Sequence, residues 1–211
     1  MIRILIADDH SIVRKGIHQI LIEGFPGAKI EEVENAEFMI KKVMEEEWDV
    51  VISDLSMPGR SGLEAIAQIK QISPKLPILI MSIHPEEHYA VRVLKAGGSG
   101  YLSKDLAPEE LINAVKRVIS GRKYITSPVA EKLASLIDQD DEKPRHYMLS
   151  DREFAVMKLL GSGKSLSEIA ASMILSINTV STYRSRILVK MNLKNNTELT
   201  LYCIENNLMQ N

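Results

Sequence analysis

Five short apolar runs alternate with stretches of helical spacing along the first 120 residues of the chain. Several runs are apolar almost throughout, which is typical of strands buried on both faces of a parallel sheet. The runs are ILIAD (4–8), KIEEV (29–33), VVISD (50–54), ILIMS (78–82) and GYLSK (100–104). Between the runs, apolar residues recur every three or four positions, as on one face of a helix. The alternation predicts right-handed crossovers and a five-stranded parallel sheet covered by helices. If the strand order is 2-1-3-4-5, the third strand is the central one.

The pattern changes after residue 121. A short helical stretch (128–137) leads into a polar, charged segment with a proline (138–148), which indicates a linker. Only helical spacing follows, at 150–160, 166–173, 178–191 and 197–206. We therefore expect an α/β domain over residues 1–122, a linker with a short helix over 123–147, and an all-α four-helix domain over 148–211.

Composition narrows the class of protein. Cys203 is the only cysteine, so an intramolecular disulfide and a cysteine-based metal site are excluded. The apolar runs are much shorter than the roughly 20 residues of a membrane span, and acids stand where a signal peptide would continue apolar. We expect a cytoplasmic protein that does not enter a membrane. The last 66 residues carry seven Lys or Arg against five Asp or Glu, a small basic excess.

Polar side chains follow the apolar strands at the points where the strands end. Asp8 and Asp9 follow the first strand, Asp54 ends the third, Ser82 the fourth and Lys104 the fifth. Because the carboxyl ends of parallel strands meet at one edge of a sheet, these side chains should share one crevice. One acid at a strand end is usually a turn former, but successive strands repeat the feature here.

Carboxylates, a hydroxyl and an ammonium in one crevice are suited to phosphoryl transfer, which mainly requires positioning and charge neutralisation. Mg²⁺ prefers oxygen ligands, and we expect Asp8, Asp9, Asp54 and the backbone carbonyl of Ser56 to hold it. Asp54 is the predicted nucleophile, with Lys104 and Ser82 bonding the phosphoryl oxygens. We interpret His10, beside the acid pair, as an exposed loop residue rather than a metal ligand.

Together, DDH (8–10), DLSMPGRSG (54–62), Ser82 and GYLSKD (100–105) resemble the receiver domain of bacterial two-component response regulators. The resemblance implies a flavodoxin-like fold in which Asp54 accepts phosphate from a phosphohistidine of a sensor histidine kinase. It also implies a switch in which Ser82 moves toward the phosphoryl group and Tyr101 turns inward. His84 lies where such domains control the loss of phosphate.

The segment 165–193 has the outline of a helix-turn-helix. A scaffold helix, a turn at 174–177 and a following helix anchored by Val180, Ile187 and Met191 would leave a polar outer face. That face mixes hydroxyl and basic side chains, which bond base edges and phosphates. The expected DNA contacts are Thr179, Ser181, Thr182, Arg184, Ser185, Arg186 and Lys190.

Residues 149–208 are similar to the LuxR-type DNA-binding domain that ends NarL/FixJ-type response regulators. Leu149, Glu153, Gly163, Thr179 and Val180 are among the residues that fall in register. The chain departs from many members at several positions, so the resemblance does not indicate the DNA sequence that it binds. The departures are Ser181, Tyr183, Ser185 and Asn196. By resemblance, the last helix is the dimer surface of this domain; by its residues alone, the apolar side of that helix fits a core equally well.

The predicted function is a transcriptional response regulator rather than an enzyme: phosphorylation of Asp54 with Mg²⁺ would favour a homodimer that binds double-stranded DNA. RNA polymerase is a further candidate partner. One alternative is a DNA-binding regulator that works without phosphorylation. Another is a metal-dependent phosphatase that uses the same acids, although its helical domain would then lack a purpose.

Overall fold

The computed structural model describes residues 1–57, 60–138 and 144–209. Two stretches used above, 58–59 in the segment after Asp54 and 139–143 in the predicted linker, lie outside the described residues. The chain divides into two compact units, Met1–Ser135 and Leu136–Asn211. In the described part of the chain, no helix combines the length and the apolar character that crossing a bilayer requires.

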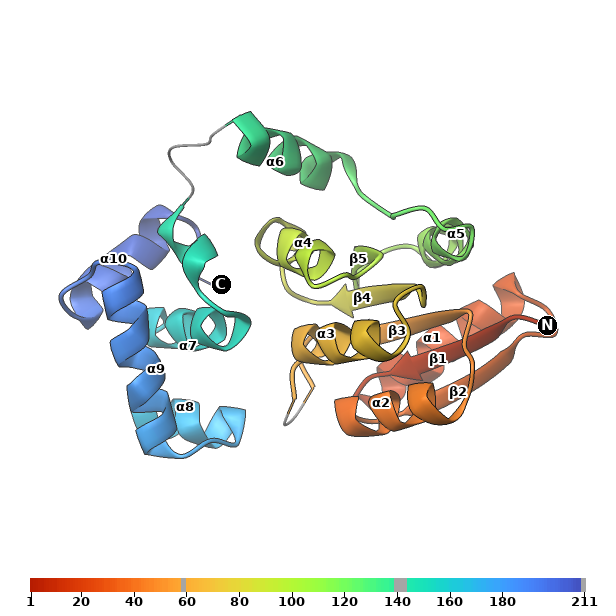
Figure 1. Ribbon diagram of the computed structural model, residues 1–211, viewed down its shortest axis with the longest axis horizontal. Helices are drawn as coiled ribbons and strands as arrows, with labels where there is room; N and C mark the ends of the chain where they lie inside the picture. Colours follow the sequence, from red (N-terminus) through yellow and green to blue (C-terminus); the bar gives the residue numbers. More distant parts are fainter. Residues whose placement is uncertain (58–59, 139–143, 210–211) are drawn as a thin grey trace. The chain divides into compact units, whose positions relative to one another are not determined.

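The first unit is a parallel sheet wrapped by helices (Figure 1). Its five strands pair in the order β2-β1-β3-β4-β5, which confirms the predicted topology. The strands are β1 (Arg3–Ala7), β2 (Lys29–Val33), β3 (Val50–Asp54), β4 (Ile78–Ser82) and β5 (Gly100–Ser103). The helices between and after them are α1 (Ser11–Gly24), α2 (Ala36–Glu45), α3 (Gly62–Ile72), α4 (Glu86–Lys95), α5 (Pro108–Ile119) and α6 (Ser127–Asp138).

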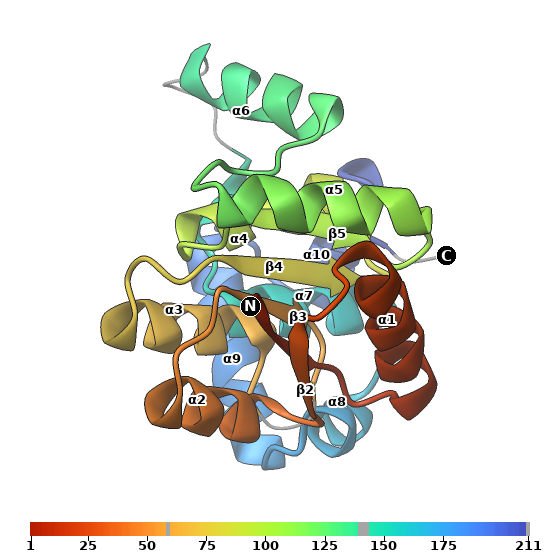
Figure 2. The same cartoon turned by 90° about the vertical axis from the view of Figure 1, so that its right-hand side faces the viewer.

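Burial explains the apolar runs. Every residue of β3 and β4 is buried, because both faces of these central strands are covered. One face packs on α1 and α5, and Figure 2 shows these helices on the opposite side of the sheet from α2 and α3. The edge strand β2 instead consists of exposed and half-buried residues, which matches its charged sequence.

The second unit is helical. A short 3-10 helix, η1 (Arg145–Met148), precedes α7 (Asp151–Gly161), α8 (Leu166–Met173), α9 (Ile177–Lys190) and α10 (Asn196–Glu205). Capping boxes at Ser150 and Ser165 start α7 and α8, and Ser176 caps α9. Helix α7 lies at the centre of this unit and contacts α8, α9 and α10.

Candidate functional site

The strand-end acids converge as predicted. Ala7 pairs with Ser53 across β1 and β3, so Asp8 and Asp54 leave neighbouring strands at the same edge of the sheet. Asp8 is 1% exposed and Asp54 is 5% exposed. Asp8, Asp9, His10 and Asp54 each place one potential ligand atom within 4.8 Å of the others. The crevice therefore concentrates oxygen ligands where a cation can reach them.

Lys104 lies between the two buried acids. Its Nζ is 2.7 Å from Oδ2 of Asp8 and 3.0 Å from Oδ2 of Asp54. The backbone N–H of Lys104 donates to the carbonyl of Ser82 at 2.9 Å, which fixes the start of the side chain. Burial alone would lower the pKa of Lys104, but the two carboxylates outweigh it and raise the pKa, so the ammonium stays charged.

Asp54 keeps a raised pKa despite this partner. Burial is the main cause, and the negative charge of Asp8 adds to it. The ammonium of Lys104 and a backbone hydrogen bond from Ser56 act in the opposite direction. Two buried carboxylates with one ammonium leave the crevice short of positive charge, which a divalent cation would supply.

The predicted switch residues form one hydrogen-bonded group beside the acids. Ser82 is fully buried, and its Oγ accepts the backbone N–H of His84 at 3.2 Å. The Tyr101 hydroxyl donates to the carbonyl of His84 at 2.6 Å, and the ring is 3% exposed. Burial raises the pKa of Tyr101 far above its usual range, so this hydroxyl remains a donor. The tyrosine thus lies inside, in contact with the backbone that follows β4.

His84 links this group to the loop after Asp54. Its Nε2 lies 3.0 Å from Oγ of Ser56, and its ring stacks on Tyr89 at 5.2 Å between centroids. Spacing in the sequence did not predict the contact with Ser56, since 28 residues separate the pair.

His10 lies closer to the acids than the interpretation as a plain loop residue implies. Its Nδ1 is 2.9 Å from Oδ1 of Asp9 and 3.5 Å from Oδ1 of Asp8. The side chain is 66% exposed, as expected of a loop residue. His10 is also the residue before α1, where its backbone N–H donates to Asp8 at 2.7 Å.

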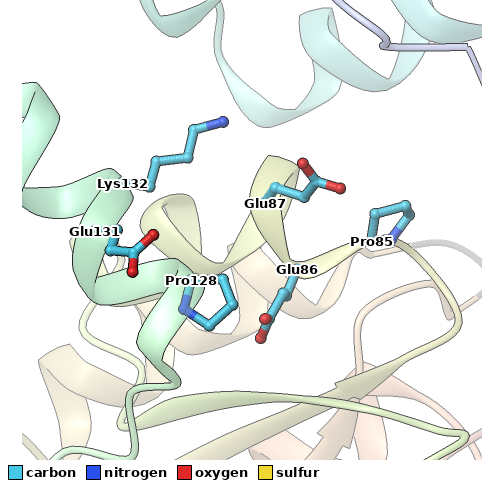
Figure 3. Close-up of a pocket in the computed structure, with 6 residues that line it drawn as sticks. All are labelled: Pro85, Glu86, Glu87, Pro128, Glu131 and Lys132. Carbon is cyan, nitrogen blue, oxygen red and sulfur yellow. The ribbon is translucent and has the colours of Figure 1, made fainter.

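A second hollow, of about 760 Å³, lies between the first turn of α4 and α6 (Figure 3). Its lining is mainly proline rings and carboxylates: Pro85, Glu86, Glu87, Pro128, Glu131 and Lys132. Thr126 donates to Oε2 of Glu86 at 2.9 Å, which connects the segment before α6 to α4. Three glutamates and one lysine line it, and we assign no ligand to it.

In the helical unit, α8 and α9 form the predicted helix-turn-helix. Ile174 ends α8 in the left-handed conformation (φ 54°), and Ser176 starts α9 two residues later. The three predicted anchors of α9, Val180, Ile187 and Met191, are fully buried. The opposite side of α9 is exposed or half-buried and polar.

Not all expected DNA contacts are equally available. Nε of Arg184 donates to Oδ1 of Asn196 at 2.6 Å. Nζ of Lys190 donates to Oε2 of Glu153 at 2.7 Å, and Glu153 is buried in the capping box of α7. Arg186 is exposed and has no side-chain partner among the described residues. The contact of Lys190 spans 37 residues, so no local signal in the sequence indicated it.

The apolar side of α10 is divided between core and surface. Leu199 is fully buried, which supports the core interpretation for this residue. Leu201 and Ile204 are each 55% exposed. Tyr202 is half-buried, and its hydroxyl lies 2.9 Å from Nδ1 of His146 in η1. An exposed pair of large apolar residues thus remains on this helix.

Comparisons with known proteins match each of the two units to a domain family. Residues 4–116 match the response regulator receiver domain, and residues 147–203 match the LuxR family of bacterial regulatory proteins. The response regulator UvrY of Escherichia coli K12 is 37% identical over 210 residues, covering 99% of this chain and 96% of UvrY. The response regulator GacA of Pseudomonas aeruginosa is 32% identical, covering 99% of this chain and 98% of GacA.

Among solved structures, RcsB of Salmonella enterica serovar Typhimurium, bound to the promoter rprA with the phosphomimetic BeF3⁻, has a TM-score of 0.63 and 28% identity. The alignment covers 96% of this chain and 98% of that one. A second RcsB–DNA complex has a TM-score of 0.58 and 29% identity, covering 95% and 96%. The full-length relatives are regulators rather than enzymes. The chain belongs to the NarL/FixJ-type two-component response regulators, transcriptional regulators that join a receiver domain to a LuxR-type DNA-binding domain.

Proposed function

We propose that Asp54 accepts a phosphoryl group from the phosphohistidine of a sensor histidine kinase. The observation that carries the proposal is that Asp8 and Asp54 each place a carboxylate oxygen within 3.0 Å of Nζ of Lys104 at the carboxyl edge of the sheet. A carboxylate oxygen of Asp54 forms the new P–O bond as the P–N bond breaks. The electron pair of the P–N bond stays on the nitrogen of the departing imidazole, which takes up a proton.

The residues present are suited to Mg²⁺. Asp8, Asp9 and Asp54 would hold it with the backbone carbonyl of Ser56, because hard cations prefer oxygen ligands and the single ammonium of Lys104 does not balance these carboxylates. When bound, the cation neutralises phosphoryl oxygens. Lys104 orients the phosphoryl group and neutralises part of its charge, and Ser82 offers a hydroxyl at the same edge.

We further propose that phosphorylation favours a homodimer on double-stranded DNA. Binding through one small domain is weak, and linking two raises the effective concentration of the second. The exposed apolar pair Leu201 and Ile204 on α10 suits a contact between two copies. The outer side of α9 would lie in the major groove. RcsB bound to the promoter rprA in the presence of the phosphomimetic BeF3⁻ supports DNA binding by a phosphorylated form.

Incubation with acetyl phosphate and Mg²⁺ tests the first step. Wild type should gain an acid-stable, base-labile phosphate, detected by intact-protein mass spectrometry, and Asp54→Ala should gain none. Asp105→Ala, which removes an exposed acid near the crevice, serves as the matched control. Equal labelling of Asp54→Ala and wild type would reject Asp54 as the acceptor.

Dimerisation and DNA binding are then compared with and without the phosphodonor. Phosphorylated wild type should dimerise in sedimentation analysis and bind promoter DNA more tightly, and Leu201→Glu should prevent the dimer without preventing phosphorylation. If Asp54→Ala regulates and binds DNA as well as wild type, the protein is a phosphorylation-independent regulator instead. Many cycles of phosphate release per second would support a phosphatase, which the full-length relatives argue against.

A further inference from the structure

The basic side chains of α9 differ in their hydrogen-bond partners in the folded domain. Arg184 is tied to Asn196 at the start of α10, and Lys190 is tied to the buried carboxylate of Glu153 in α7. If the ammonium of Lys190 left Glu153 to bind a phosphate, the buried carboxylate of Glu153 would remain unpaired, which costs free energy. These two cations therefore join α9 to its neighbouring helices.

Three hydroxyl side chains of α9 are also engaged. Thr182 Oγ1 donates to the carbonyl of Asn178 at 2.9 Å, and Ser185 Oγ donates to the carbonyl of Ser181 at 3.1 Å. Thr179 Oγ1 lies 2.8 Å from the capping hydroxyl of Ser176. With their protons directed into the helix, Thr182 and Ser185 offer mainly acceptor lone pairs to a ligand.

Four polar side chains of α9 have no side-chain partner in the part of the chain that the structure describes: Asn178, Ser181, Tyr183 and Arg186. Of these, Asn178, Tyr183 and Arg186 line a surface depression of about 320 Å³ together with Thr179 and Thr182. Asn178 and Arg186 are both exposed. The depression thus gathers the unengaged side-chain donors of Asn178, Tyr183 and Arg186 in one place.

The spacing of the two outer donors suits a row of base pairs. Asn178, Thr182 and Arg186 follow one another at intervals of four residues, so they rise along one side of the helix by about 6 Å per step. From Asn178 to Arg186 the rise is about 12 Å, which corresponds to roughly three to four base pairs of DNA at about 3.4 Å each. Between them, Thr182 presents a methyl group and an acceptor.

We propose that Asn178 and Arg186, rather than Arg184 and Lys190, read base edges in the major groove. The inference rests on the proposed function, because it takes the helical unit to bind DNA. Asn178 offers one donor and one acceptor side by side, which matches adenine N7 and N6; the fork of Arg186 matches O6 and N7 of guanine. The half-site should contain an adenine and a guanine about three to four base pairs apart.

Selection from a random-sequence duplex library by the full-length phosphorylated protein tests this. Wild type should enrich sites with both bases at that separation. Asn178→Ala should lose the preference at adenine only, and Arg186→Ala the preference at guanine only, each with about 10-fold weaker binding to the selected duplex. Arg186→Lys keeps the charge but not the fork, so it should not restore the guanine preference.

The matched control is Val189→Ala, which removes an 80% exposed side chain of α9 outside the depression and should keep both preferences. Circular dichroism of each variant separates loss of folding from loss of readout. Three results would overturn the inference: an unchanged base preference in both variants, an equal loss on selected and unrelated DNA with a reduced salt slope, or a base preference relaxed by Arg184→Ala or Lys190→Ala. If wild type enriches no site, the proposed function itself fails.

Discussion

At the scale of single residues, the crevice at the sheet edge holds buried carboxylates that lower the free energy of unfolding of the receiver. Asp8 and Asp54 are both buried, and the ammonium of Lys104 contacts both of them. The raised pKa of Asp54 means that the folded state binds its proton more tightly than the unfolded chain does. Such a carboxylate destabilises the fold wherever it must be ionised.

Replacing Asp54 by Asn should therefore stabilise the receiver. At pH 7 we expect the melting temperature to rise by about 2–8 °C, the shift for roughly 1 kcal/mol in domains of this size range. The gain should shrink as the pH falls through the raised folded-state pKa and disappear below the unfolded-state pKa of about 3.9, where wild-type Asp54 is neutral in both states. Differential scanning calorimetry from pH 7 to pH 4 measures this; Asp105→Asn is the exposed control. A gain that grows toward low pH would contradict the argument.

Lys190 and Glu153 present the opposite case, in which a charge pair supports the fold. Burial would raise the pKa of Glu153, but hydrogen bonds from Lys190 and Ser150 outweigh it and lower the pKa. The folded state thus prefers the carboxylate. Stability from the pair is present above the unfolded-state pKa of about 4.3 and is lost as the pH falls through the lower folded-state pKa.

Lys190→Ala should lower the free energy of unfolding of the helical unit by about 1–2 kcal/mol at pH 7, a charged hydrogen bond discounted for the partly exposed lysine. Urea denaturation followed by circular dichroism measures it. Lys194→Ala removes a neighbouring exposed lysine and should change the free energy of unfolding by less than about 0.5 kcal/mol. Equal effects of the two substitutions would show that the pair does not stabilise the domain.

At the scale of elements, the end of β3 depends on how closely α3 approaches it. The backbone N–H of Gly62 donates to the carbonyl of Leu55 at 2.9 Å. A Cβ at Gly62 would lie 2.5 Å from the carbonyl oxygen of Asp54 and 3.0 Å from Cα of Leu55, so backbone would have to move. The first turn of α3 thus needs a glycine to hold the loop after Asp54 in place.

Gly62→Ala should therefore lower the free energy of unfolding by about 1–3 kcal/mol and slow phosphorylation by acetyl phosphate, because it displaces the backbone of the acceptor. Gly16→Ala is the control within α1, since a Cβ there meets nothing within 4 Å. It should raise stability by about 0.5–1 kcal/mol and leave phosphorylation unchanged. The rate and the unfolding curve are measured on the same samples; a neutral Gly62→Ala would disprove the close packing.

At the scale of the whole molecule, the division into two units predicts two responses to Mg²⁺. Trp48, the only tryptophan of the chain, is buried in the first unit, so its fluorescence reports the receiver alone. Mg²⁺ at about 100 times its Kd should stabilise that unit by roughly 2.7 kcal/mol.

In thermal unfolding, the Trp48 fluorescence transition should shift to higher temperature with Mg²⁺, while the part of the circular dichroism signal that arises from the helical unit should not move. Asp9→Asn removes one proposed ligand and should reduce the shift. A parallel shift of both transitions would mean that the units unfold as one or that Mg²⁺ binds elsewhere.

The sequence alone determined the layout of the chain and the chemistry at the sheet edge. Residue type and period reach only a few positions along the chain, yet they predicted a parallel sheet covered by helices, because alternating strands and helices joined by crossovers have few arrangements. The same logic brought Asp8, Asp54 and Lys104 together correctly, since strand ends are defined by the chain itself.

Only the tertiary structure decided which polar side chains remain available. Arg184, Arg186 and Lys190 are alike as a basic stripe in the sequence, but Asn196 and Glu153 come from other helices and engage two of them. Tyr101 likewise gains its partner from His84, 17 residues earlier. Partners of this kind are set by how helices and strands pack in space, and the energy of a charge depends on the burial and partners that only packing supplies.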